Sequence, residues 1–230
     1  MTPRLQLLAD WVRPGAALAD VGTDHGYLPV WLALEGRVSS AIASDLRPGP
    51  LSRARETARA YHASVDCRLC DGLAAVAPEE TDTIVIAGMG GENIAAILAA
   101  APWTADGRHT LLLQPQSRAE VLRSFLEDHG FAIVREALVR DRGRMYPVME
   151  VTAGEMSLTP GERLCGVKLL RDPLWDRYLI EKILQLQEVV AGRNRSTDPL
   201  SRADADRQRE LITELLAMRE EWRHANRAGN

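Results

Sequence analysis

"LADVGTDHGYLPV", residues 18–30, joins a short aliphatic run to a glycine-containing loop. The run is typical of a buried strand, and it ends in Asp20-x-Gly22. A glycine there lets the chain turn sharply beneath an extended ligand, because a Cβ would block close approach. The middle glycine of the usual dinucleotide fingerprint is replaced by Asp24, and His25 follows it. The stretch therefore predicts a nucleotide-binding α/β fold with an acidic loop.

Similar runs recur along the chain and alternate with helical patterns, as parallel-sheet folds require. Seven strands are predicted, at residues 17–22, 39–45, 64–69, 82–88, 109–115, 131–138 and 145–152. Helices are predicted at residues 27–34, 48–61, 93–100 and 117–129, the last with a capping box of Ser117 and Glu120. The last two strands are too close for a helical crossover and should pair antiparallel. This pattern favours the Rossmann-like class I methyltransferase sheet over a six-stranded dinucleotide fold.

The pattern changes after about residue 155. Two apolar stripes follow at helical spacing, and they consist of Leu179, Ile183, Leu186 and Val190, and of Leu211, Leu215, Met218 and Trp222. Such stripes predict an antiparallel helical hairpin of the coiled-coil kind. We therefore expect an α/β domain over residues 1–154 and a helical domain over residues 155–230.

Composition excludes several classes of protein. With 230 residues, 46% of them hydrophobic, the chain can fold around a sizeable core. No run approaches the roughly 18 apolar residues of a membrane span, and the first residues lack the apolar stretch of a secretory signal, so a cytoplasmic location is expected. Cys67 and Cys70 lie three apart on a predicted strand and face opposite sides, which predicts buried reduced thiols and no metal site.

Aspartates end the first three predicted strands, at Asp20, Asp45 and Asp71. Each alone is equally explained as a turn or helix-cap residue, but together they lie at the sheet edge where ligands bind. Carboxylates repel a pyrophosphate and suit a cofactor with a sulfonium and an ammonium group, such as S-adenosylmethionine. Asp45 follows the glycine loop at about the distance, roughly 20 residues, at which a carboxylate reaches ribose hydroxyls. Asp71 is placed to accept from an adenine amino group.

Two later loops complete the predicted site. The glycines of "AGMGGEN", residues 87–93, let the backbone pass close to a planar group of a ligand. A tight strand-to-helix turn needs the same glycines. "LLLQPQ", residues 111–116, places Gln114 and Gln116 where their amides can meet a base edge. Pro115 between them either stiffens this segment or simply ends the strand.

Taken in order along the chain, these motifs resemble the bacterial tRNA adenine-22 N1-methyltransferase family. The segments that carry the resemblance are "DVGTDHGYLP", "ASDLRPGPLSRA", "DGL", "IAGMGG", "LLLQPQ" and "GRMYPVMEV". The aspartate-histidine variant of the glycine loop and "IAGMGG" are the most specific, because generic methyltransferases do not share them.

The resemblance implies S-adenosylmethionine as methyl donor and N1 of an adenine in the D-arm region of tRNA as acceptor. It implies that Asp20, Gly22, Asp24 and His25 line the methionine part of the cofactor and that Asp45 holds its ribose. Asp71 and Gly72 would bracket the adenine ring, whereas Gly88, Met89 and Gly90 would shape the floor near the methyl group. Tyr27 would stand at the mouth of the site near the target base.

The chemistry of the acceptor limits what the protein must supply. Adenine N1 carries an in-plane lone pair, so methyl transfer requires alignment and no general base. This agrees with the lack of an Asp/Asn-Pro-Pro-Tyr/Phe motif after the fourth strand. Asp24 is the candidate for stabilising the positive charge that develops on the ring. Tyr27 is equally explained as a packing residue, and His25 as a helix cap.

Arginine supplies nearly all the positive charge that an RNA would contact. Two groups are candidates for phosphate binding: Arg142 and Arg144 at the predicted hairpin, with Arg135 and Arg140 nearby, and Arg193 and Arg195 near the helical loop, with Arg202 beyond. A solvated surface is the alternative for each of them.

Three other functions stay open from the residues alone. The alternatives are a methyltransferase that acts on another RNA or on a small molecule, and a non-catalytic helical binding module on a degenerate nucleotide fold. An NAD-dependent dehydrogenase is disfavoured by Asp24 in the pyrophosphate loop. A monomer is the favoured oligomeric state.

Overall fold

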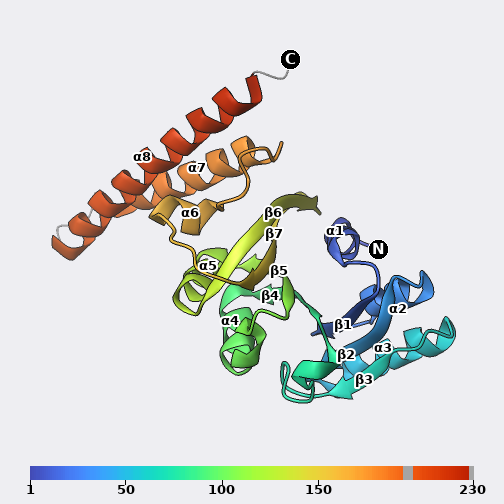
Figure 1. Ribbon diagram of the computed structural model, residues 1–230. Coiled ribbons are helices and arrows are strands. Elements are labelled where there is room, and N and C mark those ends of the chain that lie inside the picture. The colour runs from blue at the N-terminus through green and yellow to red at the C-terminus, as the bar shows by residue number, and fades with distance from the viewer. Residues whose placement is uncertain (194–198, 228–230) are drawn as a thin grey trace. The chain divides into compact units, whose positions relative to one another are not determined.

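A single seven-stranded sheet organises the α/β part of the residues that the structure describes, in the order β3-β2-β1-β4-β5-β7-β6 (Figure 1). The computed structural model describes residues 1–193 and 199–227. The strands are β1 (Ala16–Val21), β2 (Val38–Asp45), β3 (Asp66–Leu69), β4 (Thr83–Gly90), β5 (Thr110–Ser117), β6 (Phe131–Asp141) and β7 (Arg144–Ala153). Strands β1 to β5 pair in parallel, and β7 pairs antiparallel with β5 and β6. The predicted strands and terminal hairpin are confirmed.

Helices connect the strands on both faces of this sheet. They are α1 (Pro3–Trp11), α2 (Tyr27–Leu34), α3 (Pro48–Ala60), α4 (Gly91–Ala99) and α5 (Ala119–Asp128), with short 3-10 turns at Pro78–Glu80 and Pro102–Ala105. From β1 the chain moves outward through β2 and β3, and from β4 it moves the opposite way to β5. Because crossovers are right-handed, α2 and α3 cover one face and α4 covers the other. A crevice therefore opens beyond the carboxyl ends of β1 and β4.

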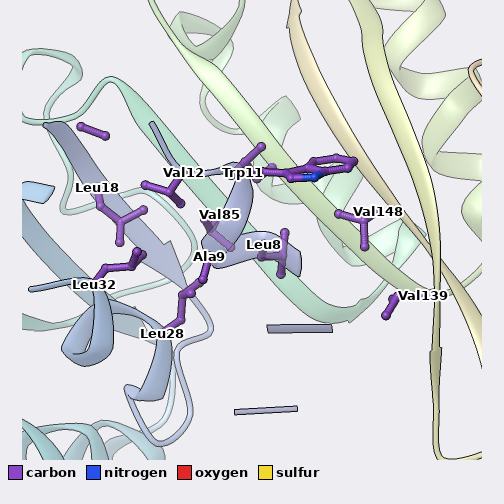
Figure 2. Packing of buried hydrophobic residues seen from close by; sticks show 12 residues of the cluster. Leu8, Ala9, Trp11, Val12, Leu18, Leu28, Leu32, Val85, Val139 and Val148 are labelled. Atoms are coloured by element: carbon purple, nitrogen blue, oxygen red, sulfur yellow. The ribbon is translucent and has the colours of Figure 1, made fainter. Parts of the chain in front are cut away.

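Helix α1 is an element that the sequence patterns did not predict. Its start is set by Thr2, whose Oγ1 accepts from the backbone N–H of Leu5 at 3.4 Å, and by Pro3 at the first helical position. Its apolar face belongs to the buried cluster shown in Figure 2, together with residues of α2, β1, β4, β5, β6 and β7. The α1 residues of this cluster are Leu8, Ala9 and Trp11, and Val12 follows directly after the helix.

The carboxyl end of α1 is held by a side chain from the loop before β2. Arg37 Nη2 donates to the carbonyl oxygens of Ala9 and Val12, at 3.2 and 2.8 Å. Since the last carbonyls of a helix lack partners within the helix, this arginine satisfies groups that would otherwise need water. Helix α1 is thus anchored at its end as well as along its buried face.

Two local predictions are wrong. Ser117 is the last residue of β5, and the helix that follows is capped by Arg118 with φ of +56° and no side-chain capping bond. Glu120 pairs with Arg118 at 3.1 Å instead of closing a capping box. Cys67 and Cys70 are free but only half-buried, because β3 is an edge strand with solvent on one side.

The chain divides into two compact units, Met1–Ser157 and Leu158–Asn230. The second unit contains α6 (Pro160–Cys165), α7 (Trp175–Arg193) and α8 (Pro199–Arg227). Asp176 at the start of α7 pairs with Arg219 late in α8 at 2.6 Å, so the two long helices run antiparallel as predicted. Among the helices that the structure describes, none is long and apolar enough to cross a membrane.

Candidate functional site

A cleft of about 1170 Å³ opens at the carboxyl ends of β1, β2, β4 and β5. It gathers most of the residues that the sequence singled out. Those that line it are Asp20, Gly22, Asp24, His25, Tyr27, Asp45, Asp71, Gly72, Gly88, Met89, Gln114, Gln116 and Arg142. Gly90 is not among the lining residues, because it caps the start of α4.

The loop after β1 forms one wall of the cleft. The backbone N–H groups of Gly22 and Thr23 donate to the carbonyl oxygen of Ser44, at 2.8 and 3.0 Å, and this fixes the loop to β2. Gly22 has a φ of +72°, and a Cβ there would overlap the terminal methyl group of Met89. Glycine is therefore required on two grounds, the backbone conformation and the close approach of the Met89 loop.

Two aspartates are buried at neighbouring strand ends. Asp20 and Asp45 are each 6% exposed. Burial raises the pKa of Asp20 to about 6; the hydrogen bond donated by Thr23 Oγ1, at 2.6 Å, opposes this shift, and the negative charge of Asp45 adds to it. Asp45 Oδ1 accepts from the backbone N–H of Arg47 at 2.9 Å. The two buried carboxylates therefore concentrate negative potential in this part of the cleft.

Asp24, His25 and Tyr27 lie at the rim of the cleft. The Tyr27 side chain stacks on His25, with ring centroids 5.2 Å apart and planes 7° from parallel, and Tyr27 is 51% exposed. Exposure argues against the packing role considered for Tyr27. Asp24 pairs with Arg53 at 2.8 Å, and its other oxygen lies 3.7 Å from His25 Nε2. The Arg53 charge offsets part of the Asp24 charge, which leaves Asp20 as the stronger attraction for a cation.

The two glutamines of "LLLQPQ" differ in their surroundings. Gln114 is 1% exposed; its Oε1 accepts from the backbone N–H of Gly88 at 3.3 Å, and its Nε2 donates to the carbonyl oxygen of Pro115 at 2.9 Å. Both ends of this amide are bonded to protein groups, so the expectation that it meets a base edge is not supported. Gln116 is exposed and keeps its amide beside Gly88.

The arginines are only partly brought to the cleft. Arg142, in the β6–β7 turn with φ of +48°, lines it, whereas Arg144 is exposed at the start of β7 and does not. Arg193 ends α7 in the second unit and pairs with Asp204. Arg195 lies outside the described residues. Of the predicted phosphate-binding arginines within the first unit, Arg142 is thus the one at the cleft.

Several lining residues carried no recognisable signal in the sequence. These are Arg4 from α1, Leu46 after β2, Asn93 in α4 and Trp103 in the turn before β5. Trp103 meets the ring of His109 edge-on, with centroids 4.9 Å apart. The proximity of Arg4 and Trp103 to the cleft depends on tertiary packing, which no short motif encodes.

Comparisons with known proteins identify relatives of this cleft and sheet. Residues 1–149 match the family described as Methyltransferase domain. The chain is 36% identical over 157 residues to the tRNA (adenine(22)-N(1))-methyltransferase of Bacillus subtilis, across 67% of this chain and 66% of that protein. The crystal structure of the B. subtilis M1A22 tRNA methyltransferase TrmK is similar with a TM-score of 0.80 and 28% identity over 98% of both chains. A Streptococcus pneumoniae protein in complex with S-adenosyl-L-methionine gives a TM-score of 0.81 and 33% identity, over 94% of this chain and 99% of that chain.

Proposed function

The chain belongs to the TrmK-type family of class I methyltransferases, and we propose that it transfers a methyl group from S-adenosylmethionine to N1 of adenine 22 in the D-arm region of tRNA. The observation that carries this proposal is the acidic cleft at the sheet edge. It joins two buried aspartates to a glycine loop and to an exposed aromatic side chain at its rim.

The chemistry of the cleft fits S-adenosylmethionine. This cofactor carries a positive sulfonium and a positive ammonium group, which the carboxylates of Asp20 and Asp24 attract. A pyrophosphate in the same place would be repelled, which argues against NAD. Gly22 and Gly88, both with positive φ, keep the backbone close to the cleft without side chains that would fill it.

Different residues of the cleft are assigned to different parts of the cofactor. We assign Asp20 to the ammonium group and Asp45 to the ribose hydroxyls, with Asp71 and Gly72 at the adenine ring. Met89 and Gly88 form the floor near the transferred group, and His25 and Asp24 form the wall after β1. When bound, the cofactor supplies an electrophilic methyl group on its sulfonium.

The target base is held at the rim. The exposed ring of Tyr27 offers a face on which adenine can stack, and His25 supports that ring from its other side. Gln116 offers an exposed amide to the base edge, and Arg142 offers a cation to the phosphate backbone. Adenine N1 needs no general base, so the protein contributes chiefly by orientation. Asp24 is placed to stabilise the positive charge of the methylated ring.

Binding of S-adenosylmethionine should weaken as the pH falls below 6. The pKa of Asp20 is about 6, so its side chain is ionised at pH 7 and largely neutral at pH 5. Because only the carboxylate attracts the ammonium group, the Kd is expected to rise about tenfold per pH unit below 6. Isothermal titration calorimetry between pH 5 and 7 measures this, and a constant Kd across that range contradicts the assignment.

The control is Asp20→Asn, which should bind weakly at every pH in that range. Burial raises the pKa of Asp20 in the folded protein above its value in the unfolded chain, so folding takes up a proton between about pH 4 and 6. The stabilisation that this proton gives is lost as the pH rises through 6. The ionised side chain therefore destabilises the free protein at pH 7. The variant should unfold at a higher urea concentration than wild type at pH 7, which separates lost binding from lost folding.

Removing the aromatic ring of Tyr27 should weaken use of tRNA without affecting the cofactor. Base stacking on an aromatic side chain is worth about 1–3 kcal/mol, so Tyr27→Ala should lower kcat/KM for tRNA roughly 10- to 100-fold. Tyr27→Phe keeps the ring and should stay close to wild type. Kinetics at saturating S-adenosylmethionine measure the effect, and an unchanged kcat/KM in Tyr27→Ala removes the residue from the substrate site.

The proposed substrate class is tested by the dependence of activity on salt. Methyl transfer from labelled S-adenosylmethionine to unmodified tRNA should fall steeply with rising salt, because phosphate contacts release counterions. Cofactor binding measured in the same buffers should change far less. Transfer to a small molecule with no such dependence would point to a different methyltransferase.

A further inference from the structure

The backbone of Gly88 departs from the ladder between β4 and β5. The register of these strands shifts between Ala87 and Met89, and Gly88 bulges out with a φ of +79°. Its N–H donates to Gln114 Oε1 at 3.3 Å, a side chain on the neighbouring strand. The path of the chain at the floor of the cleft therefore depends on a side-chain acceptor.

Gln114 supplies this acceptor in only one of its two amide orientations. Its Nε2 donates to the carbonyl oxygen of Pro115 at 2.9 Å, and its Oε1 accepts a second hydrogen bond from Arg4 Nη1 at 3.2 Å. A guanidinium donates hydrogen bonds and accepts none. Arg4 therefore selects the orientation in which the oxygen faces Gly88.

Arg4 is itself fixed by two further contacts. Its Nε donates to Asp141 Oδ2 at 2.7 Å, and the Asp141 side chain is only 7% exposed. Its guanidinium carbon lies 4.8 Å from the ring centroid of Tyr146. Such a charge-assisted contact in a poorly solvated place holds its geometry well. Since Asp141 precedes Arg142 in the β6–β7 turn, Arg4 also connects the cleft floor to that turn.

From these contacts we infer that Arg4 is a positioning residue for methyl transfer, acting through Gln114 on the backbone of Gly88. This inference rests on the proposed function, because it takes the Gly88 loop as the floor beneath the transferred methyl group. Without Arg4 the Gln114 amide loses the partner that orients it, and Gly88 loses a fixed acceptor. The Gly88 backbone at the floor of the cleft then shifts relative to the methyl donor and the target adenine, although the side chains assigned to hold the cofactor are unchanged.

The test compares Arg4→Met with Arg37→Met. Both remove an arginine that anchors α1, but Arg37 bonds the carboxyl end of that helix and does not line the cleft. Arg4→Met should lower kcat roughly 10- to 100-fold, with the Kd for S-adenosylmethionine close to wild type, since small misplacements have effects of that size. Arg37→Met should keep a kcat close to wild type. Equal losses of kcat in the two variants would overturn the inference, because both would then report only the loosening of α1.

Two further variants examine the path through Gln114. Gln114→Met should reproduce the loss of kcat, and the double variant should be no worse than either single one, because both act on one contact chain. Arg4→Lys should rescue only part of the activity, since an ammonium lacks the planar fork that meets Asp141 and Gln114 together. Additive losses in the double variant would separate the two residues and contradict the proposed path.

A readout that needs no tRNA separates this inference from the proposed function. In protein labelled with ¹⁵N-glycine, the amide of Gly88 should shift and exchange faster in Arg4→Met but not in Arg37→Met. If the wild-type protein transferred no methyl group to tRNA, the proposed function would fail. The Gly88 amide signal would still show whether Arg4 positions the loop. An unchanged Gly88 amide in Arg4→Met would overturn the inference.

Discussion

Replacing Asp45 with alanine is expected to raise the Kd for S-adenosylmethionine about 100-fold or more. Asp45 ends β2 with 6% exposure and is assigned to both ribose hydroxyls. Hydrogen bonds to a charged group are worth about 1.5–3 kcal/mol each, so losing two removes about 3 kcal/mol or more of binding free energy. Calorimetric titration measures the change, and kcat at saturating cofactor should stay near wild type because the ribose is not the reacting group.

The Asp45 variant needs a control for its local structural role. Asp45 also accepts from the backbone N–H of Arg47, so its removal loosens the start of α3. Asp45→Asn keeps an acceptor for that bond and should lose less affinity. Asp66→Ala removes an exposed aspartate of the adjacent strand outside the cleft and should leave the Kd unchanged. A wild-type Kd in Asp45→Ala would show that the ribose is bound elsewhere.

Replacing Glu136 with glutamine is expected to lower the free energy of unfolding by about 3–5 kcal/mol. Glu136 Oε1 accepts from Arg123 Nη2 at 2.7 Å and from Arg123 Nε at 3.0 Å, and both side chains are fully buried. The buried guanidinium would then lose the negative charge of Glu136, which accepts two of its hydrogen bonds. Urea unfolding measures the loss, while affinity for S-adenosylmethionine should not change at temperatures where the variant is folded, because neither residue lines the cleft.

Two controls separate this buried pair from ordinary ion pairs. Glu150→Gln breaks the looser pair with Arg135, 3.8 Å long with a half-exposed arginine, and should cost less than about 1 kcal/mol. The double replacement Arg123→Met with Glu136→Leu should recover most of the lost stability, because both charges of this buried pair are then removed together. Equal losses in Glu136→Gln and Glu150→Gln would mean that burial adds nothing to this interaction.

The seven strands, the terminal hairpin and the sheet edge at which the aspartates gather could be predicted from the sequence. Each aspartate follows an aliphatic run, so Asp20, Asp45 and Asp71 were predicted to lie at one edge of the sheet, and all three line the cleft. The aliphatic runs before these aspartates are short, local patterns that predict strands clearly. The exposed Tyr27 was left open by the sequence, since a tyrosine at the start of a helix is compatible with either a buried or an exposed ring.

What could not be predicted depends on bulges and on tertiary contacts. The β6–β7 pairing shifts register between Ile133 and Arg135, and beyond this point the opposite alternation faces the core. Glu136 is therefore buried where strict alternation places it in solvent. In the same way, the bulge at Gly88 turns the backbone N–H of that residue toward Gln114, whose Oε1 accepts a hydrogen bond from it. Arg4 belongs to a helix whose short amphipathic pattern gave no signal, so its approach to the cleft could not be expected.

The central claim is tested most directly by locating the methyl group on the product. Purified protein is incubated with labelled S-adenosylmethionine and an unmodified tRNA transcript, alongside a transcript in which adenine 22 is replaced by guanine, and the modified nucleotide is mapped by mass spectrometry. The account predicts N1-methyladenine at position 22 of the first transcript and no methylation of the second. Methylation of both transcripts, or binding of the cofactor without transfer to either, would contradict it.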